Sequence, residues 1–317
     1  MRVLVTGSSG LVGSAMVAHA CRLGCDVVGV DNNQRADFFG PAGDTRPTLA
    51  EQQRRFPTFR HVDLDVRDRG AVDRLVPTGG FALVVHAAAQ PSHDLAARRP
   101  FDDFDVNATG TLNLLEACRQ NAPECVFAFL STNKVYGDGP NRLPFVELRT
   151  RFDFAEPAQR RGIDERFPID QTLHSVFGAS KVAADVMVQE YGRYFGLRTG
   201  VVRGGCLTGP RHRGVALHGF VNHLVRTALA GGDYVVYGFH GKQVRDQLHA
   251  DDVAEALWAF AAAPRPGEVY NLGGGPENAA SLLECVDRVE ALCGRRPRLR
   301  FGGAERRQAG REGLVGA

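Results

Sequence analysis

The sequence predicts a doubly wound α/β fold, in which a parallel sheet carries helices on both faces. Three observations support this prediction. Short apolar segments alternate with helical segments from the first residues to Arg203, and a glycine-rich turn, Gly7–Gly13, joins the first apolar segment to the first helix. The second apolar segment ends in an acidic residue, Asp31. Such alternation is typical of a parallel sheet, because parallel neighbours need a crossover connection.

The expected strands are short apolar runs, and the expected helices have apolar residues near helical spacing. In chain order the strands are Arg2–Thr6, Asp26–Val30, Phe59–Val62, Phe81–His86, Cys125–Leu130 and Leu197–Arg203. The helices of this part are Ser14–Leu23, Phe104–Gln120 and Ser175–Phe195. Two stretches have no clear period. Asn32–Arg55 is expected to be a loop with a short helix, and Gly139–Leu173 a long loop, which inside a compact domain is usually functional.

We expect one large domain followed by a smaller C-terminal lobe. Residues 1–203 form the sheet domain, including the long loop at 139–173. Residues 204–301 contain shorter elements, such as Tyr234–Tyr237 and Val269–Leu272, and are expected to close over the carboxyl edge of the sheet, where ligands bind in such folds. Residues 302–317 are polar and glycine-rich, and a poorly ordered tail is expected there.

The composition is that of an ordinary globular protein, with 44% hydrophobic and 23% charged residues. A net charge of +2 gives no reason to expect nucleic acid or an anionic membrane as a partner. No apolar run approaches the roughly 18 residues of a membrane span, and no signal peptide is expected. The seven cysteines are scattered, with Cys21 and Cys25 as the closest pair, so we expect reduced thiols, a cytoplasmic protein and no metal site.

The glycine-rich turn predicts a dinucleotide site of the Rossmann type. Gly7, Gly10 and Gly13 allow the backbone to approach a pyrophosphate, and the following helix supplies free N–H groups and the positive end of its dipole. Asp31 is placed to accept hydrogen bonds from an adenosine ribose and to repel a 2′-phosphate, which favours NAD over NADP. The alternative is a glycine turn followed by an unrelated acidic residue.

The chain also carries a series of short motifs in a characteristic order. They are Thr6–Gly13, Asp31, Asp65–Val66, His86–Ala89, Asn107, Ser131–Gly137, Ser180–Lys181, Gly209–Pro210, Gln243–Asp246, His249 and Asp251. In this order they resemble the extended short-chain dehydrogenase/reductase family, the NAD-dependent sugar-nucleotide epimerases and dehydratases, over residues 1–300. The resemblance implies a bound NAD held by Gly7, Gly10, Leu11, Val12, Gly13, Asp31, Asn32, Asp65, Val66, Ala87, Ala88, Ala89, Asn107 and Lys181.

Within this family, the run Ser131–Asp138 resembles the CDP-paratose (CDP-tyvelose) 2-epimerases. Two further runs, Ala89–Asp94 and Gly162–Glu165, resemble proteins of the same group. A 4,6-dehydratase of the family has Asp and Glu directly after the threonine of this run, as an acid and base to eliminate water. Here those positions hold Asn133 and Lys134, so this elimination is not expected.

The resemblance implies an epimerase that oxidises a sugar hydroxyl carbon with tightly held NAD and reduces the ketone again on its other face. In the family the proton acceptor is a tyrosine four residues before a lysine, and here Phe177 stands at that position before Lys181. Thr132 would hydrogen-bond the reacting oxygen, and Lys181 would bind the nicotinamide ribose. The expected catalytic residues are Thr132, Asn133, Lys134, Phe177 and Lys181.

Phenylalanine cannot transfer a proton, so three interpretations stay open. Another group acts as the base, with Lys134, His93 and Tyr136 as candidates. The reaction needs less help from a base. Or the protein is a non-catalytic binder of NAD and a nucleotide-sugar. We expect an active NAD-dependent nucleotide-sugar epimerase of the CDP-sugar 2-epimerase type, with another nucleotide-sugar oxidoreductase as a further alternative.

The expected substrate is a CDP-hexose bound by Gln90, His93, Arg203 and Arg245. The guanidinium of Arg245 would clamp a diphosphate, and a surface ion pair with a neighbouring aspartate is the alternative. The family often has Asn and Tyr where this chain has Cys206 and Thr208, and it continues past the position of Arg300 with an Asp-containing segment, so we expect altered nucleotide contacts. A homodimer or a higher homo-oligomer is also expected.

Overall fold

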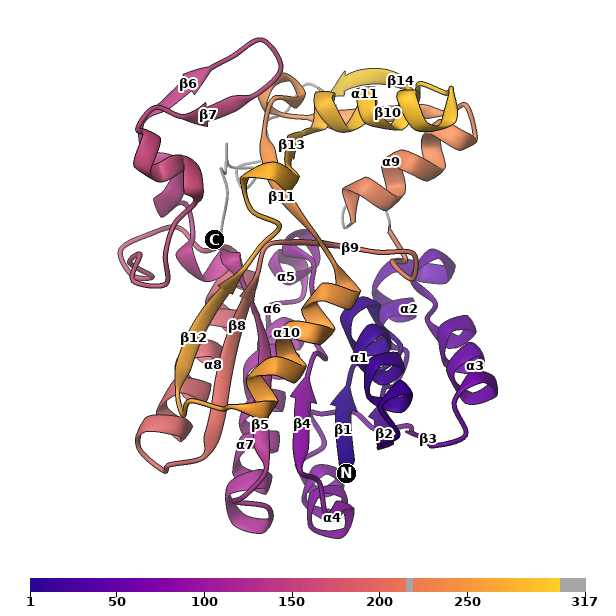
Figure 1. Cartoon of the computed structure of the whole chain (residues 1–317), viewed down its shortest axis with the longest axis vertical. Coiled ribbons are helices and arrows are strands. Elements are labelled where there is room, and N and C mark those ends of the chain that lie inside the picture. Colours follow the sequence, from indigo (N-terminus) through magenta and orange to yellow (C-terminus); the bar gives the residue numbers. More distant parts are fainter. Residues whose placement is uncertain (215–218, 303–317) are drawn as a thin grey trace.

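The structure, a computed structural model, describes residues 1–214 and 219–302. Its centre is a seven-stranded parallel sheet in the order β12-β8-β5-β4-β1-β2-β3, with helices on both faces (Figure 1). The predicted doubly wound α/β fold is therefore confirmed. The strands are β1 (Arg2–Thr6), β2 (Asp26–Val30), β3 (Phe59–Val62), β4 (Leu83–His86), β5 (Val126–Thr132), β8 (Arg198–Gly204) and β12 (Glu268–Leu272).

Two apolar cores lie on the two faces of this sheet. Val3 and Val5 of β1 pack against α1 (Leu11–Arg22) and α10 (Ala250–Ala262), whereas Leu4 faces the opposite core with α4 (Arg69–Gly79), α7 (Gly110–Asn121) and α8 (Ser175–Arg193). Successive side chains of a strand point to opposite faces, and both faces are covered here. Because both faces are buried, β1 carries consecutive apolar residues, Val3, Leu4 and Val5, and not apolar residues in alternation with polar ones.

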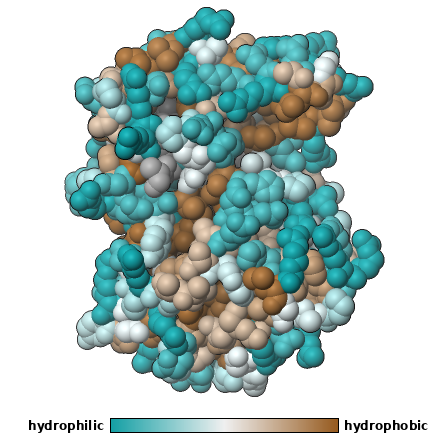
Figure 2. Space-filling model, viewed as in Figure 1, coloured by the Kyte–Doolittle hydropathy of each residue, from teal (hydrophilic) through white to brown (hydrophobic). Residues whose placement is uncertain are grey.

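The lobe lies above the carboxyl ends of the strands (Figure 1). It packs around its own core, which includes Leu224, Tyr234 and Val286. Figure 2 shows apolar side chains gathered on the lobe where Figure 1 places α9, β10 and β14, elements that expose Leu229 and Phe301. Its elements are α9 (Phe220–Leu229), α11 (Leu282–Cys293), the pair β10 (Asp233–Tyr237) and β14 (Arg298–Gly302), and the sheet β9 (Cys206–Thr208), β11 (Val244–His249) and β13 (Ala279–Ser281).

The lobe is not the continuous segment 204–301 that the sequence predicts. β12 pairs with β8 as the edge strand of the main sheet, and Leu257 of α10 lies in the same core as α1. Both elements are apolar and short, so their sequences do not distinguish a lobe element from a sheet element. At the C-terminal end, β14 runs to Gly302; the rest of the predicted tail lies outside the described residues.

The two stretches without period contain more regular structure than expected. Asn32–Arg55 holds two helices, α2 (Gln34–Phe39) and α3 (Arg46–Arg55), rather than a loop with one. The long loop after β5 carries a small hairpin of β6 (Phe145–Glu147) and β7 (Phe152–Phe154). Before α7 the chain forms α5 (His93–Arg98), α6 (Pro100–Phe104) and a π-helical turn over Asp105–Thr109. Among the described residues, no helix combines the length and apolarity needed to cross a bilayer.

Candidate active site

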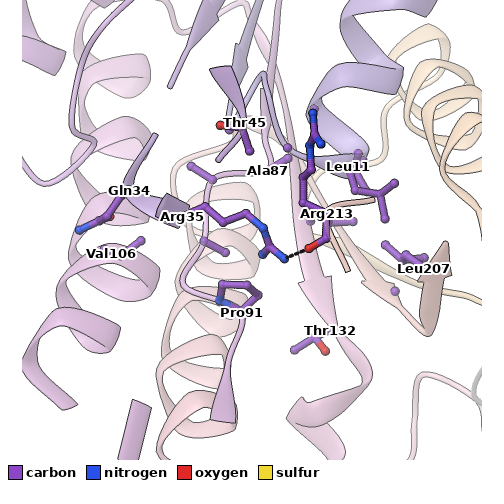
Figure 3. Close-up of a pocket in the computed structure, with 18 of the residues that line it drawn as sticks. Leu11, Gln34, Arg35, Thr45, Ala87, Pro91, Val106, Thr132, Leu207 and Arg213 are labelled. Carbon is purple, nitrogen blue, oxygen red and sulfur yellow. Dashed lines mark hydrogen bonds between the residues drawn. The ribbon is translucent and has the colours of Figure 1, made fainter. Parts of the chain in front are cut away.

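A pocket of about 390 Å³ lies at the carboxyl edge of the sheet, between the sheet domain and the lobe. Its walls come from the turns after β1, β2, β4 and β5, from α8, and from the segment that leads into the lobe. Figure 3 shows the same convergence, with Leu11 and Ala87 from the sheet domain and Leu207 from the lobe around one space. This edge is where folds of this class bind ligands.

The glycine turn is packed too tightly for any larger residue. A Cβ on Gly13 would lie 2.0 Å from the carbonyl oxygen of Gly7, and Gly7 itself has a φ of +66° and lies against Ala87 and Ala88. α1 begins directly after the turn, and its N-cap, Gly10, contributes no side-chain hydrogen bond to the first turn. The first N–H groups of the helix thus face the pocket as a site for a pyrophosphate.

An unsatisfied hydroxyl beside the turn also fits a polar ligand. In the described part of the chain, the buried side-chain oxygens of Ser8 and Ser9 have no hydrogen-bond partner, and Ser9 lines the pocket. Buried polar groups are normally paired, so the side-chain oxygen of Ser9 is suited to a ligand or to water, whereas Ser8 is outside the described pocket lining. Asp31 lines the same end, where its carboxylate accepts from the backbone N–H groups of Ser9 (3.0 Å) and Asn33 (2.9 Å).

Asp65 and Val66 stand where the family resemblance implies contact with the adenine of NAD, and with Asn32 they form a fixed group at one end of the pocket. Asp65 accepts from the guanidinium of Arg67, at 2.7 Å for the Nη2–Oδ2 contact, and from the side chain of Asn32 at 3.0 Å. These contacts hold the pKa of Asp65 below its ordinary value, against the effect of burial, which acts to raise it. Asp65, Asn32 and Val66 all line the pocket, so a negatively charged carboxylate lies where the resemblance implies the adenine.

The opposite end of the pocket holds the predicted catalytic residues. Thr132, Asn133, Lys134, Phe177 and Lys181 all line it. The side-chain oxygen of Thr132 accepts from the backbone N–H of Lys134 at 3.3 Å, which fixes the turn after β5. The structure therefore brings together residues that lie far apart in the sequence.

Lys181 is buried at the floor of this end. Its ammonium donates to the carbonyl oxygen of Leu130 at 2.8 Å and lies 4.1 Å from the centroid of the Phe129 ring. Burial lowers the pKa of Lys181 to about 7, although the charges of Asp185 and Asp103 act to raise it. The group is therefore close to its titration at neutral pH, unlike an ordinary lysine.

This lowered pKa predicts a pH dependence of stability that Lys181→Met removes. The folded state releases the proton near pH 7, whereas the unfolded chain holds it to about pH 10, so the free energy of unfolding rises with pH between these values. We expect the difference between wild type and Lys181→Met to grow in favour of wild type by about 2 kcal/mol from pH 7 to pH 9, measured by urea unfolding.

Lys242→Met is the matched control, because the Lys242 ammonium pairs with Glu147 at 2.8 Å on the lobe. For this variant, the difference in the free energy of unfolding from wild type should not change between pH 7 and pH 9. A flat difference for Lys181→Met as well would contradict a destabilised ammonium.

Two predicted ligand contacts are buried beneath the pocket instead of lining it. Asn107 and Gln90 are each 1% exposed and bond to each other, since Gln90 N–H donates to Asn107 Oδ1 at 3.0 Å. The amide of Asn107 also donates to Asp103 and to the hydroxyl of Ser180, both at 3.1 Å. These residues tie the loop after β4 to α8 and so position the site, and their direct contacts with a ligand stay predictions.

The two predicted substrate arginines also lie outside the described lining. Arg203 is 3% exposed, and its guanidinium pairs with Asp185 at 2.8 Å and donates to Tyr136 Oη at 2.9 Å. Arg203 ends a strand at the carboxyl edge of the sheet, which predicted a contact with an anionic substrate. In the structure its guanidinium is instead paired with the buried carboxylate of Asp185. Arg245 donates to the carbonyl oxygen of Val244, and its charge acts to lower the pKa of Cys206, which lines the pocket. Arg245 is therefore close to a residue of the pocket wall.

Several pocket residues lie where no motif was recognised. Arg35 of α2 reaches across the pocket and donates to the carbonyl oxygen of Arg213 at 2.8 Å, as Figure 3 shows. This contact joins the sheet domain to the segment before the lobe, over the cofactor end. Asn32–Arg55 is expected from the sequence to be mainly a loop, so the sequence offers no reason to predict that Arg35 lines the pocket. Other such lining residues are Gln34, Phe38, Thr45, Val106, Leu207, Arg211, His212 and Phe220.

Fold and pocket together define a dinucleotide-binding enzyme of the α/β class. The model of the NAD dependent epimerase/dehydratase family matches residues 3–273, and the chain belongs to this family. NAD is its cofactor, and the glycine turn, the Ser9 hydroxyl and Asp31 fit that group. Within the described residues, no three His, Cys, Asp or Glu side chains are arranged to hold a metal.

Three relatives illustrate the range of the family. CDP-paratose 2-epimerase of Salmonella typhi is 33% identical over 92% of this chain and 85% of its own length. A probable dTDP-glucose 4,6-dehydratase of Sinorhizobium fredii is 30% identical over 92% of this chain and 75% of its own. The structure of Thermus thermophilus UDP-glucose 4-epimerase with NAD is 28% identical, with a TM-score of 0.76 over 97% of this chain and 88% of that one.

Proposed function

We propose that this protein is an NAD-dependent nucleotide-sugar epimerase that inverts C2 of a CDP-linked hexose. The observation that carries the proposal is the reactive end of the pocket, where Thr132 is followed by Asn133 and Lys134. A 4,6-elimination needs a carboxylate pair at these positions, and inversion by oxidation and reduction does not. The relation to a CDP-paratose 2-epimerase, at 33% identity, supports the same choice.

Each half of the pocket has a separate task in this proposal. The glycine turn and Asp31 hold the cofactor, and Lys181 holds its nicotinamide ribose. Bound NAD supplies a reversible acceptor for the hydrogen and electron pair of a C–H bond. Thr132 orients the sugar hydroxyl, and Arg245, near Cys206 of the pocket wall, attracts the diphosphate. The expected homo-oligomer and cytoplasmic location stay predictions.

The test is incubation of the purified protein with CDP-, UDP-, dTDP- and GDP-hexoses in deuterated water, followed by NMR. We expect a C2 epimer only from CDP-hexoses, with protium retained at C2, because the same hydrogen leaves and returns. Deuterium at C2 would indicate deprotonation at carbon and contradict the oxidative route. If NAD and nucleotide-sugars bind and no product forms, the protein is a non-catalytic binder, the alternative that Phe177 favours.

A further inference from the structure

The side chains around Phe177 decide which group can take the proton that a tyrosine would take. Tyr136 is 0% exposed, its hydroxyl bonds to Arg203 and to Asn271 at 2.6 Å, and it is outside the described pocket lining. It is not the base. Cys206 lines the pocket, but burial raises the pKa of its thiol to about 11, so it is protonated at neutral pH.

Lysine is a poor substitute here. Lys134 lines the pocket at the turn after β5, and a lysine can accept a proton only as the neutral amine, because its ammonium has no lone pair. Lys181 is committed to the carbonyl oxygen of Leu130 at 2.8 Å. Asp31 and Asp65 lie at the cofactor's adenosine end of the pocket, with their carboxylates bonded there.

His93 is the lining residue that touches Phe177 directly. The two rings meet edge to face, with centroids 4.9 Å apart and an interplanar angle of 68°. His93 is the first residue of α5, and Ser92 caps that helix by accepting from the N–H of Leu95. An imidazole is therefore fixed beside the position that the family's tyrosine would occupy.

Ser175 holds this imidazole in a defined orientation. Its hydroxyl lies 2.9 Å from Nδ1 of His93 and also accepts from the backbone N–H of Gly178 at 3.2 Å. Ser175 has a φ of +66°, a conformation that costs energy for a residue with a Cβ. The tautomer with a proton on Nδ1, which the Ser175 hydroxyl can accept together with that of Gly178, has its basic lone pair on Nε2.

We propose that His93 is the proton acceptor and donor of this enzyme, held by Ser175, in place of the missing tyrosine. This inference rests on the proposed function. In the oxidation, the sugar O–H bond breaks and an N–H bond forms at Nε2 of His93, and bound NAD would accept the hydrogen and the electron pair that leave the carbon. In the return half, both are given back, the proton to oxygen and the hydrogen to the opposite face of the carbon. No co-reactant is consumed.

Charged groups surround His93 on several elements. Lys134 and Lys181 bring positive charge to the same pocket, Asp94 lies on α5 itself, and Asp103 lies on α6, which packs against α5 and α8. Histidine is a common general acid and base in catalysis, and these are the charged groups that face it from the neighbouring elements.

His93→Asn is the first test. Asparagine keeps a polar group beside Ser175 but cannot accept a proton, so turnover should fall by roughly 10²- to 10⁴-fold, while the melting temperature and bound NAD stay unchanged. Added imidazole should restore part of the turnover. The matched control is His240→Asn, at an exposed lobe position with a φ of +51°, which asparagine tolerates and which should leave turnover unchanged.

A second readout is independent of turnover. In protein labelled at histidine Cε1, the signal missing from His93→Asn belongs to His93. We expect this signal to shift when CDP-glucose is added, and its pH titration to change in Ser175→Ala. A signal that responds to neither would place His93 away from the sugar and overturn the proposal.

The outcomes separate the two proposals. If the wild type inverts a CDP-hexose and His93→Asn stays within threefold of it, His93 is not the base and the epimerase function stands. If the wild type inverts no nucleotide-sugar, the proposed function fails and the proton role fails with it. Both proposals are supported if His93→Asn loses turnover, added imidazole restores part of it, and His240→Asn keeps the turnover of the wild type.

Discussion

Phe177→Tyr is expected to restore turnover to the His93→Asn variant by roughly 10²-fold. Phe177 is 6% exposed and lines the pocket, so the change adds one hydroxyl to a ring that is already in place. Lys181, one helical turn along α8, would stabilise the phenolate by its positive charge. The measurement is the rate of C2 inversion for the single and double variants, with bound NAD quantified in each.

The comparison with the wild-type background decides between the candidate bases. If His93 already transfers the proton, Phe177→Tyr alone should change turnover little. If Lys134 is the base, Lys134→Met should abolish turnover with NAD still bound, and His93→Asn should not. A Phe177→Tyr change that rescues nothing in the His93→Asn background would show that proton transfer is not what the variant lacks.

Arg203→Met is expected to destabilise the protein by about 3–5 kcal/mol, the cost of an unpaired buried charge. It leaves the carboxylate of Asp185, which is 0% exposed, without the guanidinium that contacts both of its oxygens at 2.8 and 3.0 Å. Although burial acts to lower the pKa of Arg203, the hydrogen bonds and charge of Asp185 raise it, so the guanidinium stays charged. Urea unfolding measures the loss.

Arg166→Met is a control of the same chemistry at the surface. Arg166 pairs with Asp164 at 2.8 Å, but the two side chains are 91% and 54% exposed. Exposed pairs contribute little, so this variant should unfold at nearly the same urea concentration as wild type. A similar loss for both variants would contradict the importance of burial, and weaker nucleotide-sugar binding by still-folded Arg203→Met would return Arg203 to the substrate site.

The cofactor half of the pocket follows from the sequence because its residues are local. Gly7–Gly13 and Asp31 occupy fixed places after β1 and β2, so their roles depend only on a strand, a turn and a helix. Arg203 shows the limit of this reasoning. A strand end predicts that the residue is near the carboxyl edge, but not that Asp185 from α8 meets it below the surface. That pairing depends on the packing of α8 against the sheet.

The proposed base, His93, also depends on a tertiary contact that the sequence does not predict. His93 and Ser175 are 82 positions apart, and no spacing rule relates them. Both are short polar residues next to helix starts, which is also where ordinary capping residues occur. Only the contact of α5 with α8 shows that one orients the other. The sequence therefore supplied His93 as one of three candidates, and the packing separated it from Tyr136.

The return of the chain to the sheet at β12 has a consequence for how such proteins diversify. Because β12 pairs with β8, the lobe is a discontinuous insertion, formed by residues on both sides of α10 and β12. A fragment that stopped at Arg203 would leave the β8 edge bare and prone to self-association. Exchanging the lobe between such proteins therefore means replacing two separate segments while α10 and β12 stay, and not swapping one terminal domain.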